Sequence, residues 1–185
     1  MTDLAPALAA LHRGLVIGLP TDTVYGIAVD PERERALRLL YEVKGRPDDK
    51  PIPILAANLA DARGFGVIDD VVAPHWPGPL TVVVRRMPAV PSWIGDRVRG
   101  TVAIRVPNHP VALEILARFG PLAVTSANRS GAEPAADDVA ARAALGSAVA
   151  VYLPGRGTGG AASTVVDLSG PKAIVVRPGP VAWGS

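Results

Sequence analysis

The chain has 185 residues, of which 49% are hydrophobic and 19% are charged, so it can bury a sizeable core and is not expected to be disordered. It contains no cysteine, which excludes disulfides, thiolate nucleophiles and cysteine-based zinc sites, and a formal net charge of +2 gives little support to nucleic-acid binding. No apolar run approaches the roughly 20 residues that cross a bilayer, and Met1–Leu4 lacks the basic start of a signal peptide. We therefore expect one cytoplasmic domain spanning residues 1–185.

The first predicted elements are two helices with a strand between them. Residues 4–13 have the pattern of a short helix that Gly14 ends, and residues 15–19 form an apolar run of strand length that Pro20 stops. A second helix is expected to begin with Asp30 as its N-cap and Pro31 at its first position, and to end at Gly45.

The rest of the chain alternates between short β-branched runs and helical patterns. Strands are predicted at residues 52–56, 80–85, 102–106, 122–125, 149–153, 163–168 and 173–177, and helices at residues 59–63, 69–73, 110–118 and 137–145. The four residues 169–172 between the last two strands suit an antiparallel hairpin. We therefore expect a mixed α/β (α+β) fold, with a mixed parallel and antiparallel sheet flanked by helices.

Two polar segments at element ends are candidate ligand sites. Pro20–Gly26 carries three hydroxyl groups and a carboxylate after the first strand, although a turn capped by its own side chains is an equal alternative. In Lys44–Pro51, an extended backbone before Pro47 would direct Lys44 and Arg46 to one side, where they could clamp a polyphosphate. Taken alone, a solvated basic loop at a helix C-terminus is the stronger interpretation of that segment.

Two later segments are also candidates. Alternation places Ser126 and Asn128 on one side, where they could contact a phosphate, ribose or base, or form a local turn. Gly155–Gly160 matches G-x-G-x-x-G, but residues 161–167 read as a strand where a dinucleotide site needs a helix, so we reject that site. A loop over a ligand and a plain connection both remain open.

Metal and nucleophile sites have weak support. His12, His75 and His109 have no ligand spacing, and each is expected to be a surface or capping residue. There is no G-x-x-x-x-G-K-[ST] phosphate loop and no Ser/His signature of a nucleophilic triad.

Seven blocks in chain order resemble the YrdC-like threonylcarbamoyl-AMP synthase family in its short, single-domain form. They run over nearly the whole chain, and together they are far more specific than any one alone. The blocks are Pro20–Gly26, Lys44-Gly45-Arg46 with Lys50, Trp76–Thr81, Thr101–Pro107 followed by His109-Pro110, Ser126-Ala127-Asn128, Ser163–Asp167 and Arg177-Pro178-Gly179.

The resemblance implies a YrdC-like fold with a twisted sheet and a concave, positively lined cavity, and a nucleotidyltransferase reaction. Threonine and bicarbonate would form a carbamate that attacks the α-phosphate of ATP, giving threonylcarbamoyl-AMP and pyrophosphate ahead of the modification of the adenosine next to the tRNA anticodon. A downstream threonylcarbamoyl transferase complex would take the product. Mg²⁺ would be held mainly by the ATP phosphates, and no protein ligand for it is nominated.

The resemblance also implies roles for individual residues. The catalytic group would be Lys44, Arg46 and Lys50, and threonine would bind to Thr23 and, through its carboxylate, to Arg105. The ATP site would comprise Arg46, Lys50, Thr101, Ser126, Asn128, Ser163 and Arg177.

The chain departs from the family pattern in two places. Residues 132–136 read Ala-Glu-Pro-Ala-Ala where the family has a proline followed by hydroxyl residues, so one hydroxyl contact to ATP is in doubt. Leu55 stands where some relatives carry histidine, which weakens the case for an imidazole near threonine.

Two alternatives to this function remain. One is a non-catalytic YrdC-like paralogue that binds double-stranded RNA or tRNA, and the other is a synthase for a different carbamoylated substrate. The full Lys44, Arg46, Lys50, Ser126 and Asn128 set argues against the first, as does the small net charge.

Overall fold

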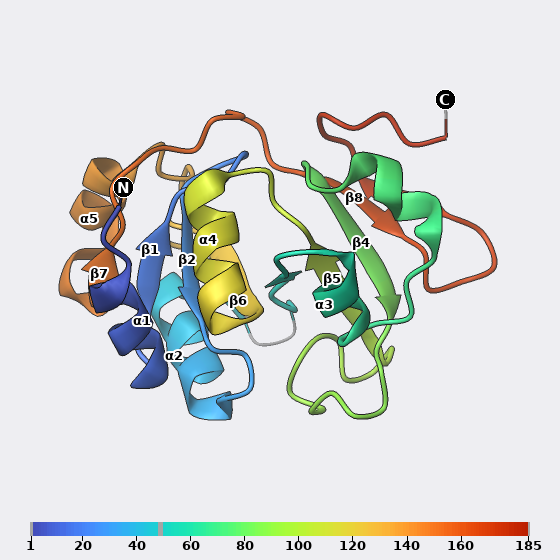
Figure 1. The fold of residues 1–185 in the computed structure, drawn as a ribbon, viewed down its shortest axis with the longest axis horizontal. Coiled ribbons are helices and arrows are strands. Elements are labelled where there is room, and N and C mark those ends of the chain that lie inside the picture. Colours follow the sequence, from blue (N-terminus) through green and yellow to red (C-terminus); the bar gives the residue numbers. More distant parts are fainter. Residues whose placement is uncertain (1, 48–49, 185) are drawn as a thin grey trace.

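The computed structural model describes residues 2–47 and 50–184 of the chain (Figure 1). Helices and strands alternate through most of this length, and the last two elements form a hairpin. The elements in chain order are α1 (Ala5–His12), β1 (Ile17–Leu19), β2 (Gly26–Val29), α2 (Glu34–Lys44), β3 (Ile54–Leu55), α3 (Leu59–Arg63), the 3₁₀ helix η1 (Asp70–His75), β4 (Leu80–Arg85), β5 (Thr101–Arg105), α4 (Pro110–Phe119), β6 (Leu122–Ser126), α5 (Asp138–Leu145), the 3₁₀ helix η2 (Gly146–Ala148), β7 (Val151–Tyr152), β8 (Thr164–Asp167) and β9 (Ile174–Arg177).

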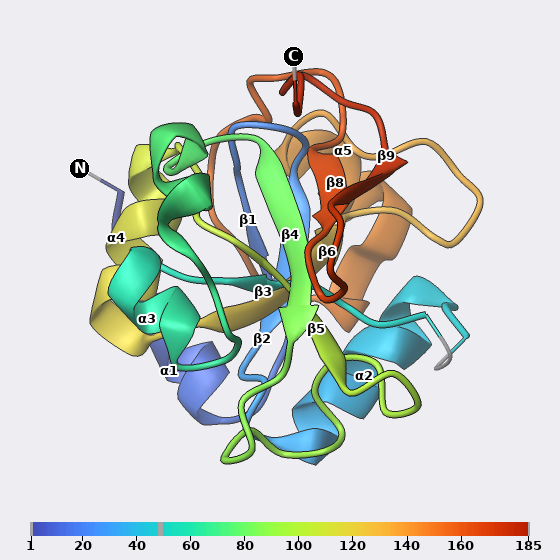
Figure 2. The same cartoon turned by 90° about the vertical axis from the view of Figure 1, so that its right-hand side faces the viewer.

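Within the described residues, nine strands form one sheet in the order β7-β1-β2-β6-β3-β5-β4-β8-β9. The pairs β1/β7, β3/β5 and β4/β8 are parallel and the other neighbours are antiparallel, which confirms the predicted mixed sheet. The predicted hairpin of the last two strands is confirmed as β8/β9. Figure 2 shows that β4 and this hairpin lie toward one end of the sheet.

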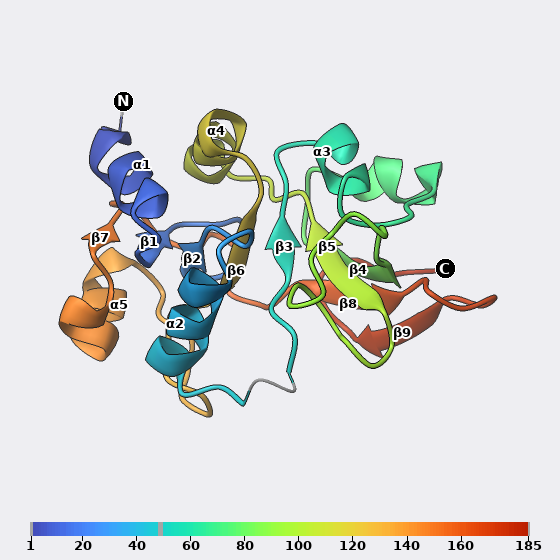
Figure 3. The same ribbon diagram turned by 90° about the horizontal axis from the view of Figure 1, so that it is seen from below.

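Helices cover both faces of the sheet. Seen from below, α1, α4 and α3 lie on one side and α2 and α5 on the other (Figure 3). One buried cluster joins α1 and α4 to the sheet and includes Leu11, Ile115 and Leu122, whereas the second joins α2 and α5 to it and includes Leu40 and Leu145. The packing of both faces explains why strands such as β1 and β2 are apolar throughout rather than alternating.

The start of α2 differs from the prediction. The helix begins at Glu34, because Asp30 caps a tight turn instead: its carboxylate accepts bonds from the Glu32 N–H at 3.0 Å and from Arg33 Nε at 3.1 Å. The predicted end is confirmed, since Gly45 adopts a left-handed conformation with φ 60° that terminates the helix.

Two other elements differ as well. β2 was not predicted, because its four residues directly follow a polar turn and are too few to display a period. The helix expected at residues 69–73 is the 3₁₀ helix η1, which contains Pro74, a residue that cannot donate an α-helical hydrogen bond.

No helix in the part of the chain that the structure describes has both the length and the apolar character to cross a membrane.

Candidate functional site

A cavity of about 320 Å³ opens where the ends of several strands converge. Its wall combines side chains from the loop after β1, the segment after α2, the ends of β5, β6 and β9, and the start of β8. The arginines Arg46, Arg105 and Arg177 all line it, and its lining residues within the described part of the chain include no carboxylate. The cavity therefore presents concentrated positive charge and hydroxyl groups to an anionic ligand.

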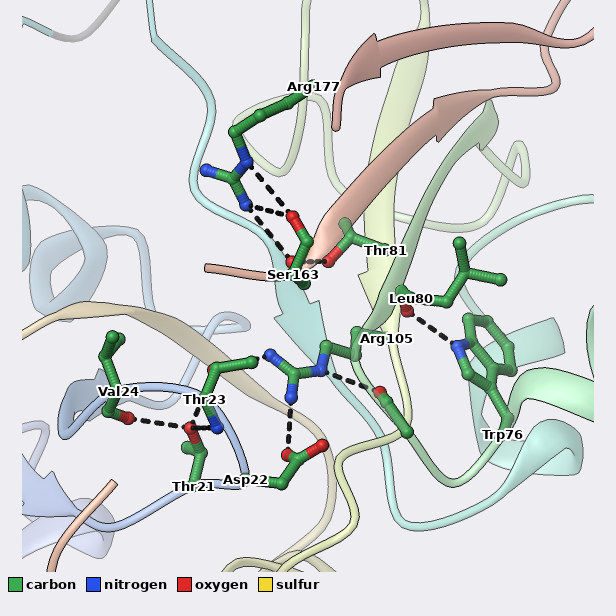
Figure 4. A network of polar contacts seen from close by, with 11 residues as sticks. Thr21, Asp22, Thr23, Val24, Trp76, Leu80, Thr81, Arg105, Ser163 and Arg177 are labelled. Carbon is green, nitrogen blue, oxygen red and sulfur yellow. Dashed lines mark hydrogen bonds and ion pairs between the residues drawn. The ribbon is translucent and has the colours of Figure 1, made fainter. Parts of the chain in front are cut away.

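Arg105, at the end of β5, is held on three sides (Figure 4). Its Nε donates to the Gly78 carbonyl at 3.0 Å, Nη1 donates to Thr23 Oγ1 at 2.9 Å, and Nη2 pairs with Asp22 Oδ1. The side chains of Arg105 and Asp22 are only 6% and 10% exposed. Burial lowers the pKa of Arg105, and the charge of Asp22 opposes that shift.

The turn that carries Thr23 is also capped by its own side chains. Thr21 Oγ1 donates to the Val24 carbonyl at 2.7 Å and accepts from the Thr23 N–H at 3.2 Å. Because the Thr21 hydrogen is used in this way, the 3.0 Å contact between the two hydroxyls has Thr23 as the donor. The turn that the sequence offered is confirmed, and the same residues line the cavity, where their binding of a ligand stays a prediction.

A second polar group surrounds Ser163, just before β8 (Figure 4). Arg177 Nη2 donates to the Ser163 carbonyl at 2.8 Å and to its hydroxyl at 3.2 Å, and Thr81 Oγ1 lies 2.8 Å from the same hydroxyl. Burial lowers the pKa of Arg177, and the charge of Arg105 lowers it further. The guanidinium groups of Arg105 and Arg177 both line this cavity, and each is close enough to act on the other's charge.

Lys44, Ser126 and Asn128 form a third group. Lys44 is 3% exposed, and its Nζ donates to the Ser126 carbonyl at 2.7 Å, to Ser126 Oγ at 2.9 Å and to Asn128 Oδ1. Burial, with a smaller contribution from Arg46, lowers the pKa of Lys44 to about 8. Ser126 lines the cavity, whereas Lys44 and Asn128 lie behind it.

Arg46 and Lys50 lie in the loop after α2. Arg46 lines the cavity and is oriented by the loop itself, since its Nε donates to the Lys50 carbonyl at 2.8 Å and its Nη2 to the Pro51 carbonyl at 3.2 Å. Lys50 is exposed and is not among the lining residues, so its role in catalysis stays a prediction. Asp48 and Asp49 in the same segment lie outside the described residues.

Thr101 is not brought to the cavity. It is the first residue of β5 and Arg105 is the last, so the two Cα atoms lie about 13 Å apart in an extended strand. Thr101 is buried beside Arg85 of β4, its register partner. Its role in binding ATP stays a prediction.

The glycine loop lies across the turn that carries Thr23. The N–H groups of Gly159 and Gly160 both donate to the Thr23 carbonyl, at 3.1 and 3.2 Å. A Cβ at Gly157 would lie 2.6 Å from the Cα of Val24, so only glycine permits this approach. Gly160 also lines the cavity.

Several lining residues were not predicted as site residues. Thr81 lines the cavity and Asp22, which does not line it, pairs with Arg105; both lie within recognised blocks, and a signal for each existed in a polar side chain next to a buried strand. Leu55 and Val124 also line the cavity, but apolar strand residues carry no sequence signal that separates a pocket wall from the core.

His109 lies near Asp22. Burial lowers the pKa of His109, and the charge of Asp22 opposes this larger effect. Among the described residues, His109 Nδ1 and Asp22 Oδ2 are buried atoms without a hydrogen-bond partner.

The described residues contain no group of three or more His, Cys, Asp or Glu side chains that could hold a metal ion. Of the residues that the structure describes, hydroxyls and guanidinium groups line the cavity, and this donor set does not fit a protein-held Mg²⁺.

Comparisons with known proteins converge on one group. The Sua5/YciO/YrdC domain model, described as "Telomere recombination", matches residues 9–179. The chain is 41% identical to a Mycobacterium tuberculosis protein over 97% of this chain and 85% of that protein, and 35% identical to the threonylcarbamoyl-AMP synthase of Vibrio cholerae over 85% and 87%.

Solved structures agree with these relatives. Sua5 of P. abyssi complexed with L-threonine superimposes with a TM-score of 0.87 at 30% identity, over 93% of this chain and 52% of that one, so this chain spans about half its length. YciO of E. coli superimposes with a TM-score of 0.85 at 26% identity, over 92% and 86%.

Proposed function

The chain belongs to the Sua5/YciO/YrdC family, and from this membership we propose that it is an L-threonylcarbamoyladenylate synthase. The reaction joins L-threonine and bicarbonate to the adenylyl group of ATP and releases water, as the carbamate forms, and pyrophosphate. The observation that carries the proposal is one cavity in which a guanidinium site for a carboxylate adjoins further arginines suited to phosphates. A nucleotidyltransferase acting on an amino-acid carbamate needs both.

Arg105 is suited to hold the threonine carboxylate. A guanidinium has five N–H groups, and the bonds to Gly78, Thr23 and Asp22 use three of them, which leaves two for a ligand. Charge-assisted hydrogen bonds from guanidinium N–H groups to a carboxylate are short and strong. The buried ion pair with Asp22 fixes the guanidinium in advance, so little side-chain entropy is lost on binding.

Thr23 takes a different part of the same substrate. Its hydroxyl donates to Thr21 Oγ1 and accepts from Arg105 Nη1, so one lone pair remains. A hydroxyl in this state accepts a hydrogen bond and cannot donate one. The Thr23 hydroxyl would therefore accept from an N–H or O–H group of the substrate threonine, while the carboxylate of the same substrate binds Arg105.

Arg46 and Arg177 are placed for the phosphates. A carbamate oxygen attacks the α-phosphorus, the bond from that phosphorus to the bridging oxygen of the β-phosphate breaks, and pyrophosphate leaves with the electron pair. This displacement needs alignment and charge neutralisation more than a covalent nucleophile. Two guanidinium groups in a partly enclosed cavity supply that charge. Mg²⁺, where ATP carries it, would be held by phosphate oxygens and water.

The proposal also covers the setting of the reaction. Residues 1–185 would act as one YrdC-like domain in the cytoplasm, and the adenylate would pass to a threonylcarbamoyl transferase complex that modifies tRNA. The alternative partner is tRNA or double-stranded RNA bound directly by the chain, which would not require synthesis of the adenylate.

The test is pyrophosphate release from ATP and Mg²⁺ by the full chain, with threonine and bicarbonate omitted in turn. Release that requires both co-substrates is the expected result. ATP binding without release would overturn the proposal in favour of the RNA-binding alternative, which gel-shift titration with tRNA would then test. Pyrophosphate release with another amino acid in place of threonine would change the proposal to a synthase for a different carbamoylated substrate.

A further inference from the structure

Lys44 has no hydrogen left for a ligand. A lysine ammonium has three N–H groups, and the Ser126 carbonyl, the Ser126 hydroxyl and Asn128 Oδ1 accept all three. The side chain is buried, and the cavity is lined by its bonding partner Ser126 instead. Arg46, two residues later, is the cation of this segment that reaches the cavity.

We propose that Lys44 is a positioning residue that fixes Ser126 and Asn128 and sets the direction of the Ser126 hydroxyl, and that it makes no contact with the phosphates. This inference rests on the proposed function, because it assigns a part in the same reaction. It differs from the role that the family resemblance implied, in which Lys44 belongs to the catalytic group that meets the nucleotide.

The first consequence concerns what Ser126 can bind. Its hydroxyl donates to Asn128 Oδ1 at 2.6 Å and accepts from Lys44 Nζ at 2.9 Å, so one lone pair is left. The cavity wall at Ser126 therefore accepts a hydrogen bond from an N–H or O–H of the substrates, such as a ribose hydroxyl or the carbamate N–H. A phosphate oxygen, which lacks a hydrogen, has no partner there.

The second consequence concerns the loop after β6. Asn128 Nδ2 donates to the Ala132 carbonyl at 2.6 Å, and the Ser130 N–H donates to the Lys44 carbonyl at 2.8 Å. Lys44 thereby ties the end of α2 to residues 126–132 through both its side chain and its backbone. Without the ammonium, Ser126 and Asn128 lose their shared donor, and only the bond to Asn128 Oδ1 still orients the Ser126 hydroxyl.

The hold of Lys44 on Ser126 and Asn128 depends on the protonation of its amine. Among the described residues, Arg46 is the charged group acting on Lys44, and the acceptors that face Lys44 from β6 and the following loop, Ser126 and Asn128, are neutral. Deprotonation leaves two N–H groups for three acceptors. Because the pKa of Lys44 lies near 8, activity should fall as pH rises through this value.

A double-mutant cycle tests the inference. Lys44→Met and Ser126→Ala are each expected to lower kcat/KM for ATP by about tenfold or more. The kcat/KM of the double variant should be no more than about threefold lower than that of the less active single variant. Arg38→Met, an exposed cation on the same helix, is the matched control and should retain wild-type activity. A double variant that loses the product of the two single effects would overturn the inference, because Lys44 would then act independently of Ser126.

A second measurement avoids any folding defect in Lys44→Met. The variant Ser126→Ala/Asn128→Ala keeps Lys44 but removes its side-chain acceptors. The decline of activity near pH 8 should be present in the wild type and absent from this variant. Persistence of this decline in the variant would show that the ammonium acts on the ligand directly and would overturn the inference.

If the wild type releases no pyrophosphate, the proposed function fails instead. The same double-mutant cycle is then measured on the Kd for ATP, where additivity overturns the inference and non-additivity supports it.

Discussion

At the scale of single residues, Arg105 does most to define the site, because three protein partners hold its guanidinium at the cavity wall. Arg105→Lys keeps the charge but cannot replace a planar fork of donors, so the KM for threonine should rise by about tenfold or more while the KM for ATP changes little. Initial rates with each substrate varied in turn measure both constants. Arg85→Lys, an exposed change on the neighbouring strand, is the control. An unchanged threonine KM would remove Arg105 from this role.

Arg46 offers a separate prediction at the phosphate end. Arg46→Ala should lower kcat/KM for ATP by an amount corresponding to about 2–3 kcal/mol, the range for a charge-assisted, bidentate contact. The fold should survive, because the bonds lost are to loop carbonyls. Circular dichroism reports the fold and pyrophosphate release the activity. Turnover within twofold of wild type would contradict the assignment.

The depressed pKa of Lys44 predicts how stability depends on pH. Below about pH 8 both states carry the proton, and above the ordinary value of 10.5 neither does. Between these values the unfolded chain binds more protons, so the free energy of unfolding gains a contribution that increases with pH. The difference between wild type and Lys44→Met in urea unfolding should therefore shift in favour of wild type from pH 8 to pH 10. A difference that is the same at every pH would refute this.

The sequence predicted which blocks contribute to the cavity better than it predicted the directions of their side chains. Ser126 and Arg46 reach the cavity as expected from their blocks. The expectation that Lys44 and Arg46 project together assumed an extended backbone, but Lys44 is the last residue of a helix and Gly45 then turns the chain in a left-handed conformation. The two cations therefore bind different partners. A local alternation rule cannot anticipate such a turn.

At the scale of elements, the glycine loop carries the clearest prediction. Gly157→Ala would place a Cβ 2.6 Å from the Val24 Cα, which pushes the loop away from the turn that bears Thr23. We expect a loss of about 1–3 kcal/mol in stability and a raised KM for threonine. Gly170→Ala, where the added methyl would meet nothing within 4 Å, is the control. Equal behaviour of the two variants, in thermal unfolding and in kinetics, would contradict the packing argument.

The elements themselves were predicted well where length and caps coincide. The strand at residues 80–85 and the helix at residues 59–63 were predicted with the observed bounds. The start of α2 was wrong because a proline after an aspartate marks a turn as readily as a helix, and only the contacts made by Asp30 distinguish them. β2 escaped notice because four buried residues have no polar face to reveal a period.

At the scale of the whole molecule, the mixed sheet was predictable but its order was not. β6 pairs with β2 and β3, and β8 lies beside β4, so neighbours in the sheet are far apart in the chain. Local sequence patterns do not predict which strands pair when those strands are far apart in the chain. The cavity follows from this order, since strand ends from distant segments meet there, and its apolar wall at Leu55 and Val124 could not be distinguished from the core.

A ligand that touches so many strands should stabilise the whole fold. ATP at about 100 times its Kd should add about 2.7 kcal/mol to the free energy of unfolding, which corresponds to a rise in Tm of about 5–10 °C. Differential scanning calorimetry with and without ATP measures this shift. Arg46→Ala should lose most of the shift at the same ATP concentration. A full shift in that variant would place the nucleotide elsewhere.

The cavity wall begins with Thr21 and Thr23 and is completed by Arg177 of the last strand. During synthesis on the ribosome, the early strands can emerge and pair long before β8 and β9 leave the exit tunnel. A nascent chain would therefore complete this cavity only once Arg177 has left the exit tunnel. Products of premature termination should be unable to sequester ATP or threonine, whatever structure their N-terminal part attains.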